Sequence, residues 1–327
     1  MKVFTQVVLS LVALFFASNL SAQEIKTSTK DDNYASIAAV KQFSYSPVNN
    51  DGTTFGPLQE ICSYLGIDVE DKDGKITLSD GKTTMIFNEW SNIAVWNGKK
   101  IKLPYKAFNV FVNRPGFPTE KLVKQRDGKK RWVDVPTPLD KVTMVPMRLL
   151  IESFGHSLTV DNDLYTIDQT SYQSSDDHRV IILLDDHIMW RIEGVSIVKK
   201  QKVSPAFTGL NYFDGEAIPN KTVIVCNLIM DAVILRRNDF DADRKSFTFD
   251  NAPMDNAFHL KYGRWGHACS PSGVKHIGQD ASHGCIRQYR AESRECFDWA
   301  YDYVVTHKRE LHVYVTGSHK TLKAKKK

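Results

Sequence analysis

The feature that most constrains the fold is a pattern of apolar residues that occurs twice in the first half of the chain, 89 residues apart. Each copy begins with proline and ends with glycine, and its apolar residues are spaced as on one face of a helix. The matching residues are Pro57, Leu58, Ile61, Cys62, Leu65 and Gly66 in the first copy, and Pro146, Met147, Leu150, Ile151, Phe154 and Gly155 in the second. The pattern predicts one short amphipathic helix in each copy.

Alternating segments follow both predicted helices. Residues 67–78 and 156–167 alternate apolar and polar side chains around central Asp, Asn and Gly residues, which is typical of β-hairpins. Residues 94–103 contain a further hairpin signal, an Asn-Gly pair between two strand-like runs. Each copy is therefore expected to form a small sheet with one packed helix.

The second half of the chain is mainly strand-like. Residues 180–192 and 222–235 are rich in β-branched and apolar residues and are bordered by turn residues. A later helical stripe consists of Phe297, Ala300, Tyr301 and Val304. Residues 311–315 form a closing strand-like run. The predicted fold class is therefore α+β and mainly β, with one helix near the C-terminus.

The N-terminal residues have the features of an export signal. Residues 1–22 contain Lys2, an apolar run over 7–16, and Ala22 at a plausible cleavage point. The run is short for a membrane span, so we expect a cleaved secretory signal peptide, with a retained anchor as the alternative. The mature protein is then expected outside the cytoplasm, in the periplasm or cell wall or fully extracellular, with no stable membrane insertion.

Composition narrows the class of protein. The hydrophobic fraction of 42% is enough for packed cores, and the net charge of +5 comes partly from a basic tail at 318–327. Nothing in the charge pattern indicates a nucleic-acid partner. The five cysteines are an odd number, which leaves at least one thiol unpaired in an oxidising compartment. Oligomeric state is left open.

The segment from His267 to Arg287 carries the residues of a candidate active site. Cys285 follows a glycine and lies close behind a histidine, and His267 lies upstream across a loop rich in Gly, Ser and Pro. A thiol becomes a good nucleophile as thiolate, which a nearby imidazole can produce. Main-chain N–H groups of Gly284 and Cys285 could form an oxyanion hole, and Arg287 could bind a carboxylate. This pattern indicates cysteine acyl transfer.

Two other readings of the same residues stay open at this point. His and Cys side chains are the usual ligands of zinc, but no pair has the CxxC or HExxH spacing, so no metal and no cofactor is predicted. Cys285 could instead form half of a structural disulfide in an exported protein.

The motif Ser282-His283-Gly284-Cys285-Ile286-Arg287, preceded at some distance by His267, resembles the signature of L,D-transpeptidase (YkuD-type) catalytic domains. The resemblance implies a β-rich domain in which Cys285 is the nucleophile and His267 the general base. Ser282, His283 and Gly284 would shape the oxyanion pocket, and Arg287 would bind substrate or hold the loop. The chain departs from the family pattern at Ala268, where glycine is usual, and it has a second thiol at Cys269.

The second repeat copy, 144–155, resembles the copper amine oxidase N-terminal-like domain, and the first copy resembles it less closely. We therefore expect these parts in order along the chain: signal peptide 1–22, flexible lead-in 23–34, a two-copy wall-binding or spacing domain 35–168, a polar linker 169–178, the catalytic domain 179–317 and the basic tail 318–327. No copper ligand set is found in the repeat domain.

The resemblance implies that the protein acts on peptidoglycan stem peptides. It would remove the terminal D-alanine of a tetrapeptide stem through a thioester on Cys285 and transfer the acyl group to an amine, which forms a 3-3 crosslink. With water as the acceptor, the same site would be an L,D-carboxypeptidase. A protein of another class, a non-catalytic wall-binding protein with Cys285 paired to Cys269, is the remaining alternative.

Overall fold

The computed structural model describes residues 40–114, 117, 120–124, 130–134, 138–175, 177–205, 231–246, 251–261, 264–282 and 284–317. The predicted signal peptide, lead-in and basic tail lie outside these residues, as does the strand-like run at 222–230. Within the described residues no helix is both long and apolar enough to span a membrane.

Both predicted helices are present. Helix α1 covers Leu58–Leu65 and helix α2 covers Met147–Ser153, each directly after its proline. Gly66 ends the first helix with φ of 68°, and Gly155 follows the second with φ of 84°. Both values lie in the left-handed region that glycine adopts without strain, which explains the glycine after each copy.

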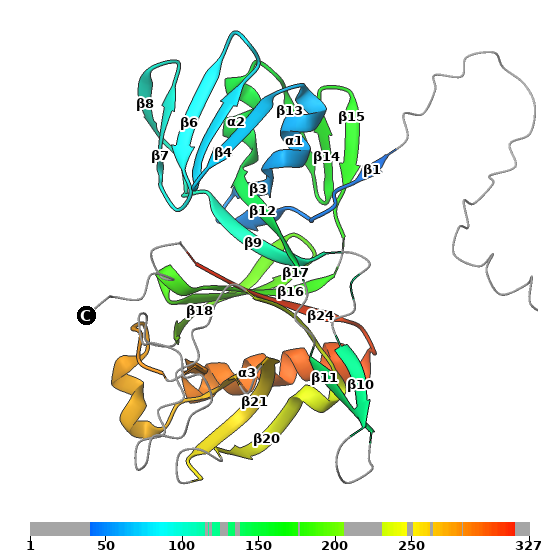
Figure 1. Ribbon diagram of the computed structural model, residues 1–327, viewed down its shortest axis with the longest axis vertical. Coiled ribbons are helices and arrows are strands. Elements are labelled where there is room, and N and C mark those ends of the chain that lie inside the picture. The colour runs from blue at the N-terminus through cyan, green and yellow to red at the C-terminus, as the bar shows by residue number, and fades with distance from the viewer. Residues whose placement is uncertain are drawn as a thin grey trace, which may run out of the picture. The chain divides into compact units, whose positions relative to one another are not determined.

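The two copies pair through the strands that precede their helices. Strand β3 (Thr53–Pro57) runs antiparallel to β12 (Leu139–Pro146), with Gly56 opposite Val145. These two positions are equivalent in the repeat, so the pairing has a local two-fold axis. Helix α1 contacts β12 and α2 contacts β3, so each helix packs on the other copy's strand (Figure 1). A Cβ at Gly56 would lie 2.5 Å from Met147 Sδ, which explains the glycine there.

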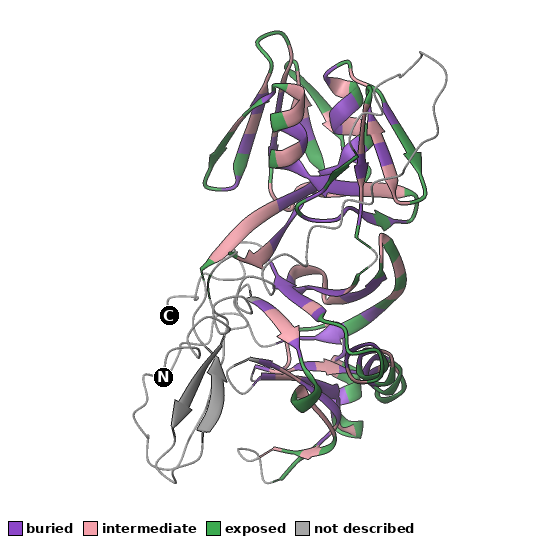
Figure 2. Cartoon of the chain, turned by 90° about the vertical axis from the view of Figure 1, so that its right-hand side faces the viewer, coloured by how far each residue is buried: buried purple, intermediate pink, exposed green. Residues whose placement is uncertain are grey.

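The three predicted hairpins are confirmed. They are β4–β5 (Asp68–Lys72 and Lys75–Ser79), β7–β8 (Ile93–Trp96 and Lys99–Lys102) and β13–β14 (Leu158–Asp161 and Leu164–Ile167). The turn residues Asp73-Gly74 and Asn97-Gly98 all have positive φ, as primed hairpin turns require. Buried residues alternate with less buried ones along β5 and β14 (Figure 2).

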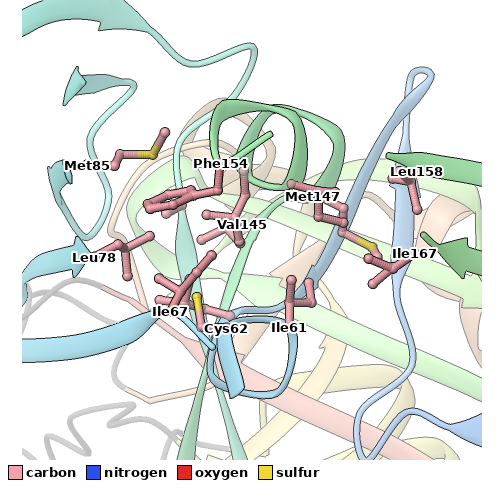
Figure 3. Packing of buried hydrophobic residues seen from close by; sticks show 14 of the residues in the cluster. Ile61, Cys62, Ile67, Leu78, Met85, Val145, Met147, Phe154, Leu158 and Ile167 are labelled. Carbon is pink, nitrogen blue, oxygen red and sulfur yellow. The ribbon is translucent and has the colours of Figure 1, made fainter. Parts of the chain in front are cut away.

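The hairpins and helices enclose one core. Strands β4, β5, β6 (Thr84–Asn88), β7 and β8 form a five-stranded sheet, and β1 (Lys41–Gln42), β15 (Thr170–Gln173), β14 and β13 form a four-stranded sheet. Ile61 and Cys62 of α1 point toward Val145 and Met147 of the second copy in the middle of this core (Figure 3). The repeat copies therefore share one hydrophobic core.

A larger sheet continues from the repeats into the second half of the chain. Its strands lie in the order β19 (Asp231–Leu235), β24 (Leu311–Thr316), β16 (His178–Leu183), β17 (Ile188–Glu193), β18 (Ser196–Ser204), β2 (Val48–Asn50), β3, β12 and β9 (Phe108–Asn113). A branch adds β20 (Phe240–Lys245), β21 (Pro253–Lys261), β22 (Arg264–Ala268) and β23 (Ile286–Gln288). Strands β10 (Glu120–Lys124) and β11 (Lys130–Asp134) form a separate hairpin.

The predicted C-terminal helix is confirmed, and it begins before and ends after the apolar residues from which it was predicted. Helix α3 covers Arg290–Tyr301 and continues as a π-helix over Asp302–Thr306. Phe297, Ala300 and Val304 are buried, and Tyr301 is 39% exposed at the edge of the stripe. Three short 3-10 helices, η1 (Leu184–Asp186), η2 (Arg237–Asp239) and η3 (Pro271–His276), complete the elements. The mainly-β class is thus the observed one.

The expected polar linker at 169–178 contains a strand. Residues 170–173 form β15, which pairs with β14 and with β1, and Tyr172 is buried there. One apolar side chain among polar ones gives no strand pattern, so composition alone indicated a loop. The boundaries of the two expected domains remain predictions, since the β2–β18 pairing joins their sheets.

Arg179, on β16, forms hydrogen bonds to the segment before β2. Its guanidinium donates to the carbonyls of Ser46 at 2.8 Å, Pro47 at 3.0 Å and Gly194 at 2.7 Å, and it lies over the Tyr45 ring. The side chain is buried, so these bonds replace water for both the charge and the carbonyls.

We predict that Arg179→Met lowers the free energy of unfolding by about 2–5 kcal/mol, because two buried carbonyls and one partly buried carbonyl lose their donor. Urea denaturation measures the change. The control Arg294→Met, at a side chain 68% exposed whose ion pair is screened by solvent, should leave the stability almost unchanged. Equal losses in the two variants would contradict the role given to Arg179.

Candidate active site

Strands β22 and β23 bring the two main candidate residues together. They pair in parallel, with Gly266 opposite Ile286, His267 opposite Arg287 and Ala268 opposite Gln288. Side chains directly opposite each other in a ladder lie on the same face of the sheet, and alternate residues share that face. His267 and Arg287 therefore share a face. Cys285 lies in the bend directly before β23, and continuing the alternation by one residue puts it on the same side as Arg287.

The opposite face of the same strands is packed into the core. Ile286 is fully buried there, and a Cβ at Gly266 would lie 2.2 Å from the ring of Phe258. Gly266 thus lets the Phe258 ring cover β22 closely. The register of the two strands, and with it the position of His267 relative to Cys285, is fixed by this core packing.

The loop between the two strands is anchored on the end of β18. Gly278 N donates to Val203 O at 3.2 Å, and the N–H groups of Ala281 and Ser282 both donate to Pro205 O at 3.0 Å. Arg287 returns to the same loop and donates to Ala281 O at 2.9 Å. Of the two roles considered for Arg287, holding the loop is the one for which the structure provides a contact.

Ser282 closes the turn that leads to Cys285. Its Oγ donates to the Cys285 carbonyl and accepts the Gly284 N–H at 3.1 Å. Gly284 has φ of 143°, a conformation that side-chain-bearing residues rarely adopt, so the glycine in the motif is required by the turn. The Gly284 N–H donates to Ser282 Oγ here, and the expected role of Gly284 in the oxyanion pocket stays a prediction. His283 lies outside the described residues.

His267 is held as a specific neutral tautomer. Its Nδ1 lies 2.7 Å from Ala268 O, and a carbonyl only accepts, so Nδ1 carries the proton and Nε2 is left with its lone pair. Burial, together with the positive charge of Arg287, lowers the pKa of His267 to about 4, against a smaller opposing effect of the Ala268 hydrogen bond. His267 is thus a neutral base at ordinary pH.

Cys269 lies on the same side of β22 as His267 but differs from Cys285 in exposure. Cys269 is buried, and this burial raises the pKa of its thiol, whereas Cys285 is half-buried. Both are thiols. Cys269 N donates to Gln288 O, which places it four residues along the ladder from Cys285, or about 13 Å. A disulfide needs Cα atoms within about 7 Å, so this register opposes the suggested Cys269–Cys285 pair.

Sequence reasoning missed a polar contact that supports the loop. His187 places Nε2 2.9 Å from Asp280 Oδ1, although 93 residues separate them. Gln201 Nε2 donates to Gln288 Oε1 at 2.7 Å beneath the site. Neither pair has a sequence signal, because the partners meet only when β18 and the loop are in place. Trp265 packs against Arg244, whose guanidinium lies 3.7 Å from the ring centre.

The described residues contain no group of three or more His, Cys, Asp or Glu side chains placed to hold a metal ion.

Comparison with known families identifies a part of the chain. Residues 37–123 match the family model described as copper amine oxidase N-terminal domain. The resemblance expected from the sequence is therefore confirmed, although the match covers the first repeat copy and ends before the second. No curated protein matches the chain significantly.

The solved structures to which the chain is similar include several L,D-transpeptidases, the family that the Ser282–Arg287 motif resembles. One from Xylanimonas cellulosilytica is 18% identical, with TM-score 0.30, over 43% of this chain and 61% of that one. One from Mycobacterium tuberculosis is 11% identical, with TM-score 0.31, over 76% and 97%. A variant from Enterococcus faecium is 12% identical, with TM-score 0.31, over 82% and 86%. These values are too low to establish a shared activity, so the proposal below rests on the site.

The neutral state of His267 predicts a pH dependence of stability. Its folded-state pKa of about 4 lies below the ordinary value of 6.5, so between these pH values the unfolded chain binds the extra proton and the folded one does not. Stability therefore falls as pH is lowered through this window. From pH 7 to pH 5 His267→Gln should lose less stability than the parent, by about 2 kcal/mol.

Urea denaturation at the two pH values measures this difference. His307→Gln is the control, because it removes a histidine whose side chain is 61% exposed and so uncovers no buried group. An identical loss in His267→Gln and the parent would contradict the burial of a neutral imidazole.

Proposed function

We propose that the protein is a cysteine L,D-transpeptidase that acts on the tetrapeptide stems of peptidoglycan. The observation that carries the proposal is the parallel register of β22 and β23, which sets His267 and Cys285 on one face beside the turn made by Ser282. Acyl transfer through cysteine requires a thiol that substrate can reach and a neutral imidazole to take its proton, and the half-buried Cys285 and the buried, neutral His267 have these properties.

The first step forms a thioester. His267 Nε2 accepts the proton of the Cys285 thiol as sulfur attacks the carbonyl carbon before the terminal D-alanine. The C–N bond of the tetrahedral intermediate then breaks, and the proton on His267 passes to the departing amine of D-alanine. Since the folded protein disfavours the charged imidazole, the proton transfer accompanies the attack instead of preceding it.

The second step releases the acyl group. An amine of a neighbouring stem attacks the thioester and gives a proton to His267, the C–S bond breaks, and the thiol of Cys285 is restored. The product is a 3-3 crosslink. With water as the attacking group the product is a tripeptide stem, and the site acts as an L,D-carboxypeptidase. Arg287, beside His267, is available to orient a substrate carboxylate in addition to its bond to Ala281.

We also propose export, which rests on the character of residues 1–22 and agrees with a substrate found outside the cytoplasm. The oxyanion donor in this proposal is the main-chain N–H of Cys285, since that of Gly284 bonds to Ser282. The register that opposes a Cys269–Cys285 disulfide weighs against the inactive wall-binding alternative.

Mass spectrometry of the mature protein incubated with purified disaccharide tetrapeptide tests the proposal. The parent should release D-alanine and form a crosslinked dimer, and Cys285→Ala should form neither. Cys269→Ala is the matched control, because its thiol is buried and outside the proposed chemistry, and it should retain activity within about threefold.

Each outcome of this experiment decides a point. Release of D-alanine with only tripeptide formed would replace transpeptidation by carboxypeptidation. Activity that survives Cys285→Ala, or its absence in the parent under reducing conditions, would overturn the proposal.

A further inference from the structure

A cavity of about 1110 Å³ lies away from Cys285, where the first repeat copy meets η1. The segment after β6 lines it with Trp90 and Asn92, the segment after β8 with Tyr105 and Lys106, and η1 with Asp186. Its volume lies just above the usual range of small-molecule sites, about 300–1,000 Å³, which suits an extended ligand of several units.

The lining has an unusual chemistry for a ligand site. Among the described residues that line the cavity none is Val, Leu, Ile, Met or Phe. The rings of Trp90 and Tyr105 pack on one side against the buried cluster around Phe55 and Trp190, and at the cavity they lie beside amide, hydroxyl, carboxylate and ammonium groups. Purely apolar ligands would leave these polar groups without partners. A sugar ring fits, because one face of it carries C–H groups that stack on an aromatic ring while its edge carries hydroxyls that bond to polar side chains.

The charged side chains of the lining indicate which ligand charge the cavity favours. Four carboxylates, on Asp73, Glu89, Asp185 and Asp186, face two ammonium groups, on Lys102 and Lys106. Lys106 is already paired with Asp186 at 2.5 Å, and the buried side chain of Glu89 is paired with Lys141 at 2.6 Å, which reduces the excess of negative charge but does not remove it. An anionic ligand would meet the excess of negative charge, so a neutral one is favoured.

Trp90 is held in a constrained position at this cavity. Its φ of 63° is rare for a bulky side chain, and its N–H donates to Ala107 O at 2.8 Å. Lys106 Nζ lies 5.3 Å from the ring centre on one side. The indole Nε1 is buried and has no hydrogen-bond partner among the described residues. Strained backbone and unmet hydrogen bonds of this kind gather at binding sites.

The cavity is connected to the catalytic loop by a short run of contacts. Asp186 of η1 is followed directly by His187, whose ring bonds to Asp280 of the loop and whose carbonyl accepts from Val203 N at 2.8 Å. Asp280 lies two residues before Ser282, which closes the turn at Cys285. A ligand bound in the cavity would thus contact η1, which is joined through His187 to the loop before Cys285.

We infer that this cavity binds a neutral oligosaccharide. The identification of that oligosaccharide as the amino-sugar strand of peptidoglycan rests on the proposed function, because the strand carries the stem peptides on which Cys285 would act. Bound there, the strand would limit which stems reach the thiol.

Calorimetric titration of the full-length mature protein carrying Cys285→Ala tests the inference, with a neutral chitotetraose-type oligomer of N-acetylglucosamine as the probe. Trp90→Gly removes the stacking ring and suits the positive φ, but the ring also packs against the buried cluster around Phe55 and Trp190, so circular dichroism must first show that the variant is folded. It should weaken binding by about tenfold or more, the loss of one good stacking contact. Asn92→Ala, at an exposed amide, should weaken it by about threefold.

Two matched controls lie outside the cavity. Tyr301→Ala removes an exposed aromatic ring and Asn238→Ala an exposed amide, and neither should change the affinity. Absence of binding by the parent, or equal affinities of the parent and Trp90→Gly, would overturn the inference. Binding of a sugar-free tetrapeptide that is lost in Trp90→Gly would also overturn it, in favour of a peptide site.

The binding titration and the test of acyl transfer can fail independently of each other. The titration uses protein without the nucleophile, so failure of acyl transfer leaves it unchanged. Conversely, Trp90→Gly in the protein with Cys285 should release D-alanine from a sugar-free tetrapeptide as the parent does, and should lose activity only on the disaccharide-linked substrate.

Discussion

The parallel pairing of β22 with β23 is the interaction on which the candidate active site depends. It joins residues on either side of a loop and gives them a fixed register, so that His267 and Arg287 lie opposite each other and Cys285 follows on the same face. The core holds this register from behind through Ile286 and through the Phe258 ring over Gly266. A shift by one residue would turn the three functional side chains into that core.

The groups that the register places on one side of the strands differ in how far they are buried, and so in how readily they ionise. His267 is removed from water and stays neutral, with its proton on Nδ1 because Ala268 O can only accept. Cys269 is removed from water as well, and its thiol is harder to ionise, whereas Cys285 is half-buried at the turn. The two thiols, sixteen residues apart in the sequence, therefore differ in reactivity because the fold buries one of them and leaves the other partly exposed.

The parts of the structure that could be predicted from the sequence are those set by local interactions. The proline and glycine around each helix and the Asp-Gly and Asn-Gly turns act within a few residues, and all were found where expected. The pairing of β2 with β18 and the contact of His187 with Asp280 join residues that are far apart in the sequence. No local or periodic pattern marks these residues as partners, so neither contact could be predicted. The site residues came from a motif, but the bond of Ser282 to the Gly284 N–H came only from the geometry of the turn.

The most direct test of this account is to trap the acyl group on the protein. Intact-mass measurement shortly after mixing with tetrapeptide substrate, followed by peptide mapping, should locate a tripeptide acyl group on Cys285, and His267→Gln should slow its formation by a factor of about 100 or more. An acyl group found on Cys269, or D-alanine released with no acylated cysteine at any time, would contradict the pairing of His267 with Cys285 as base and nucleophile.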